Sequence, residues 1–214
     1  VEPVFLHKHD NGNSTSIRLL TLGDGDFSFS AAFAKAISEI THTSELCVCG
    51  EVYFHATSLD SYEELCGKYV DARRILEQLG SKRVIRSANP ETCKCKVHVN
   101  VQHGVDATNI HDTLYVQPDE VKGALSVEDP FDVVIFNFPH LSTENAQTHS
   151  QMLAHILHSA SKPEILKPGG LVCITLADAQ PEQWKLDEMA SRVDMIIDAR
   201  TRFLSGAFTS YTSQ

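Results

Sequence analysis

The sequence predicts an α/β protein whose central sheet is mostly parallel and is covered by helices on both faces. Short apolar runs rich in Val, Ile and Leu alternate along the chain with longer segments of helical periodicity. The chain has 214 residues, of which 42% are hydrophobic and 21% charged, and this suits one globular domain with a substantial core. Such alternation implies right-handed crossovers and places ligand sites at the carboxyl ends of the strands.

The spacing of apolar residues predicts where each strand and each helix lies. Buried strands are predicted where apolar residues cluster, at residues 18–22, 52–56, 97–101, 133–136, 171–176 and 195–198. Helices are predicted where apolar residues recur at helical spacing, at residues 27–40, 61–79, 146–161 and 181–191. Ser61 and Glu64 form a capping box at the start of the second helix, and Gly80 ends it. Residues 1–16 lack periodicity, so we predict an N-terminal arm followed by one domain at residues 17–214.

Composition and charge exclude several classes of protein. No apolar run approaches the roughly 20 residues that a membrane-spanning helix needs, so we expect no membrane partner. Eighteen Lys and Arg stand against 28 Asp and Glu, and a net charge of −10 argues against a protein that coats nucleic acid over its whole surface. Six cysteines are too few for a disulfide scaffold, so we expect a reducing, intracellular compartment and no secretion.

The turn after the first strand contains two glycines that would let the backbone approach a ligand. Ser28 stands where a dinucleotide fingerprint has its third glycine, and Asp24 and Asp26 would repel a pyrophosphate. A cationic ligand suits two carboxylates better, so the turn favours S-adenosylmethionine over NAD. The alternative is a turn that only packs the strand on the helix. The predicted cofactor-binding residues here are Gly23, Asp24, Gly25, Asp26, Phe27 and Ser28.

The next two strands also end in polar residues. Thr57, Ser58 and Asp60 follow the second strand, where hydroxyl or acidic side chains could bind ribose hydroxyls. Alternatively, Ser58, Asp60 and Ser61 simply cap the next helix. After the third strand, Asp106 could accept a hydrogen bond from an adenine amino group, and Ala107 could offer its backbone N–H to the ring.

The fourth strand runs into Asn137, Phe138, Pro139 and His140. This end resembles the Asn-Pro-Pro-Tyr type of loop that N-methyltransferases place beside the transferred methyl group. Pro139 would fix the turn, Asn137 would bind the polar edge of the target, and Phe138 or His140 would stack on it. A buried strand that ends in a turn explains residues 133–136 but not this sequence after them.

Four blocks together, at residues 23–30, 56–61, 104–108 and 136–140, resemble the eukaryotic large-subunit rRNA uridine-N3 methyltransferase domain, which also occurs in proteins with a ferredoxin-fold anticodon-binding domain. The resemblance runs from about residue 17 to residue 184. It implies a Rossmann-like class I methyltransferase fold, S-adenosylmethionine as the cofactor, large-subunit rRNA or a pre-ribosome as the partner, and a nuclear or nucleolar location, with the cytoplasm as the alternative. Where the family has a closing segment, residues 208–214 read differently, so we expect a truncated or divergent last strand.

Methylation of uridine N3 requires that the base be positioned and that the imide proton leave. We predict Asn137, Pro139 and His140 as the catalytic set, with His140 as the titratable group and Asn137 also contacting the cofactor. Asp24 or Asp26 would be the alternative acceptors of the imide proton if they face the methyl group rather than the methionine amine.

A local basic stretch is the candidate RNA surface. Residues 66–96 hold eight Lys or Arg against three Asp or Glu, a net charge of +5, so the remainder carries −15. An ordinary solvated helix face is an equal alternative. The predicted RNA-binding residues are Arg73, Arg74, Lys82 and Arg83.

Two further readings stay open. Two Cys-x-Cys pairs, Cys47 with Cys49 and Cys93 with Cys95, precede neighbouring strands and could form a zinc site. The usual zinc spacing is Cys-x-x-Cys, however, and buried cysteines are common, so we predict no metal.

As alternatives to RNA methylation, the chain could be an inactive methyltransferase-fold module that binds RNA or protein, or a methyltransferase for a small molecule or protein.

Overall fold

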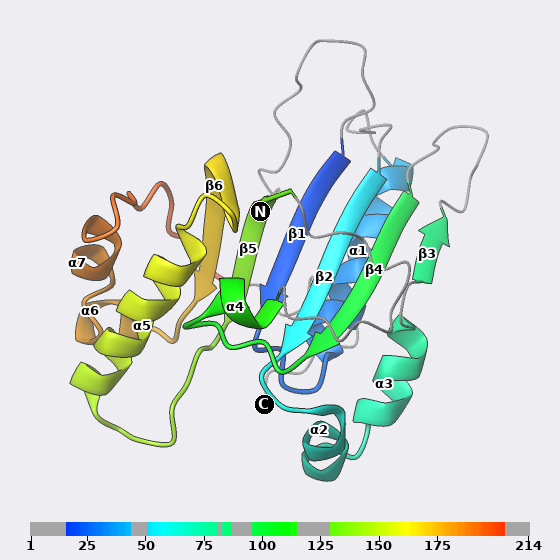
Figure 1. Cartoon of the computed structure of the whole chain (residues 1–214), viewed down its shortest axis with the longest axis horizontal. Coiled ribbons are helices and arrows are strands. Elements are labelled where there is room, and N and C mark those ends of the chain that lie inside the picture. Colours follow the sequence, from blue (N-terminus) through cyan, green and yellow to red (C-terminus); the bar gives the residue numbers. More distant parts are fainter. Residues whose placement is uncertain (1–15, 44–50, 81–82, 87–95, 115–128, 204–214) are drawn as a thin grey trace.

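The computed structural model describes residues 16–43, 51–80, 83–86, 96–114 and 129–203. These residues form a six-stranded sheet in the order β3-β4-β2-β1-β5-β6. Five strands are parallel, and β3 pairs antiparallel with β4 at one edge (Figure 1). The predicted α/β fold with a mostly parallel sheet is therefore confirmed. The strands are β1 (Ser16–Leu22), β2 (Glu51–Ser58), β3 (Arg83–Arg86), β4 (Lys96–His103), β5 (Phe131–Asn137) and β6 (Leu166–Thr175).

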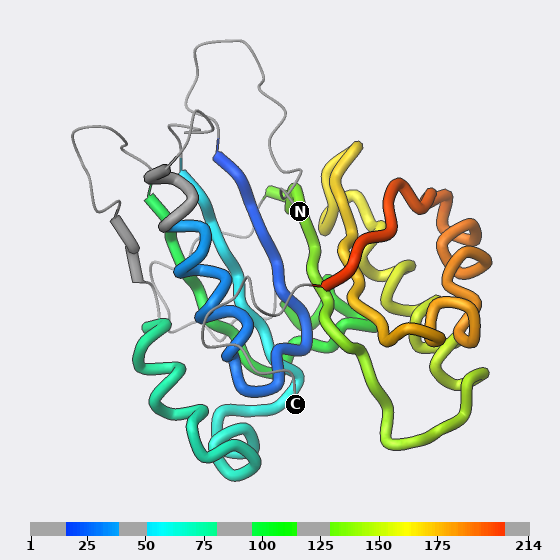
Figure 2. The backbone as a smooth tube through the Cα atoms, turned by 180° about the vertical axis from the view of Figure 1, so that it is seen from behind, coloured from blue at the N-terminus to red at the C-terminus, as the bar shows by residue number. Residues whose placement is uncertain are grey.

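Helices cover both faces of the sheet. The described helices are α1 (Ser28–Thr43), α2 (Tyr62–Lys68), α3 (Ala72–Leu79), α4 (Ile110–Leu114), α5 (Ala146–Ala160), α6 (Gln180–Gln183) and α7 (Leu186–Ser191). Helix α1 lies on one face, with α3 packed against it, and α4 and α5 lie on the other, as the two opposite views show (Figures 1 and 2).

The core explains why β1 carries leucine at three positions of its second half. Leu19 points toward the α1 face and packs in a cluster with Phe54, whereas Leu20 and Leu22 point toward α4 and pack with Ile110. A strand in a parallel sheet that helices cover on both faces is mostly apolar at successive positions. Each fully buried Leu contributes about 1.5–3 kcal/mol, so β1 is a fixed platform for the turn that follows it.

The single helix predicted at residues 61–79 is wrong, because two helices occupy this range. Ser61 forms the predicted capping box with Glu64, but α2 ends at Lys68 and Tyr69 is extended (φ −122°, ψ 117°). Asp71 precedes the start of α3, and Gly80 ends that helix. The apolar spacing in this range is compatible with one helix or with two, and the break turns Tyr69 toward the end of β1.

The strand predicted at residues 195–198 is also wrong. Met195, Ile196 and Ile197 are consecutive apolar residues, but no partner strand lies beside them in the described part of the chain, and Met195 packs against the core instead. Asp194, at φ 57°, turns the chain before this segment. The helix predicted at residues 181–191 is divided into α6 and α7 at Trp184 and Lys185.

Other differences are smaller. The sequence analysis did not anticipate the four-residue edge strand β3 or the short helix α4. Strand β6 begins at Leu166 rather than at residue 171, because a register shift against β5 absorbs the Pro-Gly-Gly segment. The closing segment at residues 208–214, for which a truncated or divergent strand was predicted, lies outside the described residues.

Candidate active site

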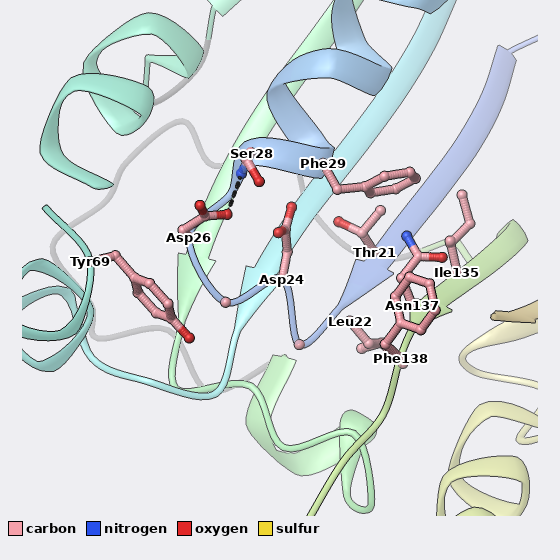
Figure 3. A pocket seen from close by; sticks show the side chains of 12 residues that line it. Thr21, Leu22, Asp24, Asp26, Ser28, Phe29, Tyr69, Ile135, Asn137 and Phe138 are labelled. Carbon is pink, nitrogen blue, oxygen red and sulfur yellow. Dashed lines mark hydrogen bonds between the residues drawn. The ribbon is translucent and has the colours of Figure 1, made fainter. Parts of the chain in front are cut away.

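A cavity of about 190 Å³ lies at the switch point of the sheet, between β1 and β5, where the order of the strands reverses. From β1 the chain proceeds to β2 and β4 on one side, and β5 and β6 lie on the other side of β1. The carboxyl ends of β1 and β5 thus border a crevice, the usual ligand position in an open parallel sheet. Figure 3 shows Tyr69 on one side of the cavity, Asn137 and Phe138 on the other, and Asp24 between them. The lining residues are Thr21, Leu22, Gly23, Asp24, Gly25, Asp26, Ser28, Phe29, Tyr69, Ile135, Asn137 and Phe138.

The glycines of the β1–α1 turn are required by space and by conformation. Gly23 has φ 60°, and a Cβ there would lie 2.6 Å from the Phe136 ring. A Cβ on Gly25 would lie 2.9 Å from the Tyr69 hydroxyl. Real Cβ atoms do not approach so closely, so side chains at either position would displace the walls of the cavity. The predicted close turn is therefore present.

Asp24 carries a carboxyl group with a raised pKa at this turn. Its backbone N–H donates to the Thr57 carbonyl at 3.0 Å, and its carboxylate accepts the Ser30 N–H at 2.7 Å, at the start of α1. Asp24 keeps some exposed surface, yet burial of the carboxyl raises its pKa from 3.8 to about 6. The Ser30 hydrogen bonds oppose this rise and the charge of Asp26 adds to it. A desolvated carboxylate of this kind gains most from a cationic ligand.

The β5 end forms the opposite wall. Phe138 has a left-handed backbone (φ 49°), its N–H donates to the Thr175 carbonyl at 2.9 Å, and the residue is 38% exposed. Its ring meets the edge of Phe203 at a centroid distance of 5.6 Å. A left-handed aromatic residue is costly, and such residues concentrate at functional sites. Asn137 accepts a hydrogen bond on Oδ1 from the Thr175 hydroxyl at 2.6 Å.

Pro139 and His140 do not line the cavity. Pro139 is buried, as expected of a residue that fixes the turn, while His140 is exposed with its ring 5.3 Å from the ring of His149. His149 accepts the Leu141 N–H on Nε2 and stacks on Trp184 at 4.2 Å, so it holds the loop after β5. The structure thus places the predicted titratable group beside the cavity rather than in it.

The predicted ribose-binding residues are engaged within the protein. The Thr57 hydroxyl donates to the Thr21 carbonyl at 2.7 Å, and the Ser58 hydroxyl donates to the Asp60 carbonyl at 3.0 Å. The carboxylate of Asp60 accepts from Lys68 Nζ at 2.6 Å. The predicted roles of these residues remain predictions.

Three more predicted cofactor residues lie away from the cavity lining. The Asp106 carboxylate accepts from the Thr108 N–H and hydroxyl at 2.8 and 2.7 Å, and Ala107 packs against the core. Phe27 has φ 61° and a fully buried side chain, so only its backbone is available to a ligand.

The basic residues are divided by the helix break. Arg73 and Arg74 lie on α3, immediately after the Tyr69 segment that lines the cavity, and Arg74 pairs with Asp71 at 3.1 Å. Arg83 begins the edge strand β3, and Lys82 lies outside the described residues. Figure 1 shows α2 and α3 beside the carboxyl ends of β2 and β4, the same edge of the sheet as the cavity.

Four polar or aromatic contributors to the site were missed by the sequence analysis, namely Thr21, Phe29, Tyr69 and Thr175, as were the aliphatic lining residues Leu22 and Ile135. Thr21 and Phe29 flank the glycine turn, so their positions next to it were an available signal. Tyr69 comes from the break between α2 and α3, which the apolar spacing of this range does not indicate. Thr175 ends a strand that is adjacent to β5 only in three dimensions.

The candidate metal site and membrane-spanning helices can be assessed only in the described part of the chain. Cys47, Cys49, Cys93 and Cys95 fall outside the described residues, and within the described ranges no cluster of three or more metal-ligating side chains is present. None of the helices in those ranges is long and apolar enough to cross a membrane.

Comparison with known proteins identifies the family. The Arabidopsis thaliana heavy metal-associated isoprenylated plant protein 41 is 29% identical over 209 residues, which cover 94% of this chain and 33% of that protein. An uncharacterized Arabidopsis thaliana protein is 24% identical over 214 residues, covering 94% of this chain and 83% of that protein. The chain thus spans about a third of the first relative and most of the second.

Among solved structures, an antibiotic-related methyltransferase aligns with 86% of this chain and 71% of its own, at 12% identity and a TM-score of 0.37. The profile of the rRNA (uridine-N3-)-methyltransferase BTM5-like family matches residues 20–214. The resemblance stated from the sequence is confirmed, and the chain belongs to the rRNA (uridine-N3-)-methyltransferase BTM5-like family.

Proposed function

We propose that the chain is an S-adenosylmethionine-dependent methyltransferase that methylates N3 of a uridine in large-subunit rRNA. One observation carries the proposal: the desolvated carboxyl of Asp24 and the amide of Asn137 line the same cavity at the switch point of a parallel sheet. The first suits a cationic cofactor and the second suits the polar edge of a base. Family membership supplies the substrate class.

The residues present fit the cofactor. Bound S-adenosylmethionine would supply an electrophilic methyl group carried on a sulfonium, together with a cationic amine. Asp24 would hold positive charge, and the backbone of Gly23, Gly25 and Ser28 would approach the methionine portion. Asp26 already accepts the Ser28 N–H at 2.9 Å and would keep the turn in shape. We assign Asp60 to the ribose, and Asp106 and Ala107 to the adenine.

At the β5 end, the chain would position the target base. Asn137 would bind its polar edge, Phe138 would stack on it, and Pro139 would keep the turn rigid. The imide proton must leave N3 as the new N–C bond forms. Asp24 lies in the cavity and would accept this proton if it faces the methyl group rather than the amine of the cofactor, whereas His140 would reach the proton only by moving away from His149.

RNA would reach the cavity across α2 and α3. Arg73 and Arg74 would bind phosphates, together with Lys82 and Arg83. Replacing all four with Gln should weaken RNA binding and flatten its salt dependence, by about 0.7 in slope for each phosphate of a single strand that is no longer neutralised, while S-adenosylmethionine affinity stays the same. An unchanged salt slope would favour a small-molecule or protein substrate. A site on rRNA would also place the protein in the nucleus or nucleolus.

Two measurements test the function. Calorimetry with S-adenosylmethionine should show binding; no binding at millimolar cofactor would instead support an inactive RNA- or protein-binding module. Transfer of a tritiated methyl group from the cofactor should label total RNA. Label in protein or in small molecules would contradict the proposed substrate class.

A further inference from the structure

Thr175 fixes the orientation of the Asn137 amide. The two residues are direct neighbours in the register of β5 and β6, and the Thr175 hydroxyl lies 2.6 Å from Asn137 Oδ1. That distance is normal for O–H···O but shorter than the usual range for N–H···O. The amide oxygen therefore faces Thr175, and the Thr175 carbonyl, which accepts the Phe138 N–H, holds the same stretch of backbone.

This orientation leaves the Asn137 amide nitrogen to face the cavity. Figure 3 shows the nitrogen directed toward the side where Thr21 and Asp24 lie, and the oxygen directed away from it. Asn137 is half-buried and lines the cavity. Its Nδ2 donates no hydrogen bond to any of the described residues. An amide NH₂ offers two donors and no acceptor. The wall therefore presents hydrogen-bond donors to a bound base.

We propose that Thr175 is a positioning residue that makes the site selective for a base with ring carbonyls on both sides of the target nitrogen. The inference rests on the proposed function and names its selectivity. Uracil has a carbonyl on each side of N3, and both oxygens accept hydrogen bonds. Cytosine keeps the C2 carbonyl but carries an amino group in place of the C4 carbonyl, and adenine carries an amino group at C6. Asn137 donors directed at that position would face another donor and find no acceptor.

The same orientation favours the reaction. When the N3 proton leaves to a base or to water, negative charge spreads onto the neighbouring carbonyl oxygens. A donor fixed at one of these oxygens stabilises that charge before N3 forms its bond to the methyl carbon and the carbon–sulfur bond breaks. A rotated amide would present its oxygen there and would lose this effect.

The decisive variant is Thr175→Val, which keeps the shape of the side chain and removes the hydroxyl. The probe is a pair of short oligoribonucleotides that differ only by a single uridine or cytidine. We expect the preference for uridine to fall about tenfold in Thr175→Val, because Asn137 can then rotate, with S-adenosylmethionine affinity unchanged. Thr175→Ser restores the hydroxyl and should restore the preference. Thr201→Val, a matched change at an exposed position, should leave it unaltered.

The preference is measured twice, by methyl transfer from a mixture of both oligonucleotides and by equilibrium binding of each. A wild-type protein that binds both equally, or a Thr175→Val variant that keeps the wild-type preference in both measurements, overturns the inference. If the wild type prefers uridine in binding but transfers no methyl group, the proposed function fails while the role of Thr175 stands. Loss of preference in Thr175→Val but not in Thr175→Ser supports the role even if both variants are less stable.

Discussion

The carboxyl ends of β1 and β5 differ from those of β2 and β4 in how their polar groups are satisfied. At β2 and β4, the Thr57 hydroxyl and the carboxylates of Asp60 and Asp106 already have partners within the protein. At β1 and β5, Asp24 is desolvated and the amide nitrogen of Asn137 faces a cavity. Polar residues that follow different strands of this sheet are therefore not equally free to bind a ligand. Their unmet electrostatic or hydrogen-bonding capacity distinguishes the two regions.

The largest effect should come from Asn137→Ala. Removing a donor that stabilises developing charge should lower kcat about 10²- to 10³-fold, while S-adenosylmethionine binding changes little. Single-turnover methylation of RNA at saturating cofactor measures this loss. His158→Ala, on the exposed side of α5, is the control and should keep full activity. Full single-turnover activity in Asn137→Ala would remove the β5 end from the site.

The next effect should come from Asp24→Asn, measured as cofactor affinity by calorimetry. Asparagine can still accept the Ser30 N–H, but it lacks the charge that would pair with the cofactor. We expect S-adenosylmethionine to bind about 10- to 100-fold more weakly. Because the buried carboxylate is unfavourable at pH 7, the free energy of unfolding should be unchanged or about 1 kcal/mol higher. Wild-type affinity in this variant would show that Asp24 is structural.

Acid should weaken cofactor binding in a defined range of pH. The folded-state pKa of Asp24 is raised from 3.8 to about 6, so the free protein is protonated there below about pH 6. A cationic cofactor needs the carboxylate, so its affinity should be flat above pH 6 and fall by up to about tenfold per pH unit below it.

The raised pKa of Asp24 affects folding in the opposite direction, because acid increases the free energy of unfolding. Its contribution to stability is fully present below pH 3.8 and is lost as the pH rises through about 6. Both dependences should be reduced in Asp24→Asn, measured by calorimetry and by urea unfolding across pH 4–8. A wild-type affinity that stays constant from pH 7 to pH 5 would contradict the raised pKa.

The smallest effect should come from Asp106→Asn, in the region whose polar groups are satisfied. The amide oxygen can still accept the Thr108 N–H, so we expect a change in cofactor affinity of only about two- to fivefold. The same calorimetric titration measures it. A loss as large as that of Asp24→Asn would erase the contrast between the two regions.

Much of this site follows from local sequence. The apolar run of β1 and the two glycines after it act through neighbouring residues, so pattern and spacing predicted them. Asn137 and Phe138 after β5 were predicted from the resemblance of their segment to a methyltransferase loop. Parallel strands then place these turns at one edge of the sheet.

The parts that could not be predicted depend on contacts between distant residues. Tyr69 lines the cavity because packing breaks the predicted helix after Lys68, and either arrangement suits the same apolar spacing. Thr175 reaches Asn137 only because β6 pairs with β5 in one particular register. His140 carried a local signal for catalysis, but the loop held by His149 turns it away from the cavity lining.

The most direct test of the central claim is the chemical identity of the methylated product. The protein is incubated with large-subunit rRNA and S-adenosylmethionine that carries an isotope-labelled methyl group, and the RNA is digested to nucleosides for mass spectrometry. The account predicts label in 3-methyluridine, absent with Asn137→Ala and strongly reduced with Asp24→Asn. Label in a methylated amino group of cytidine or adenosine, or 3-methyluridine that both variants form at the wild-type rate, would contradict it.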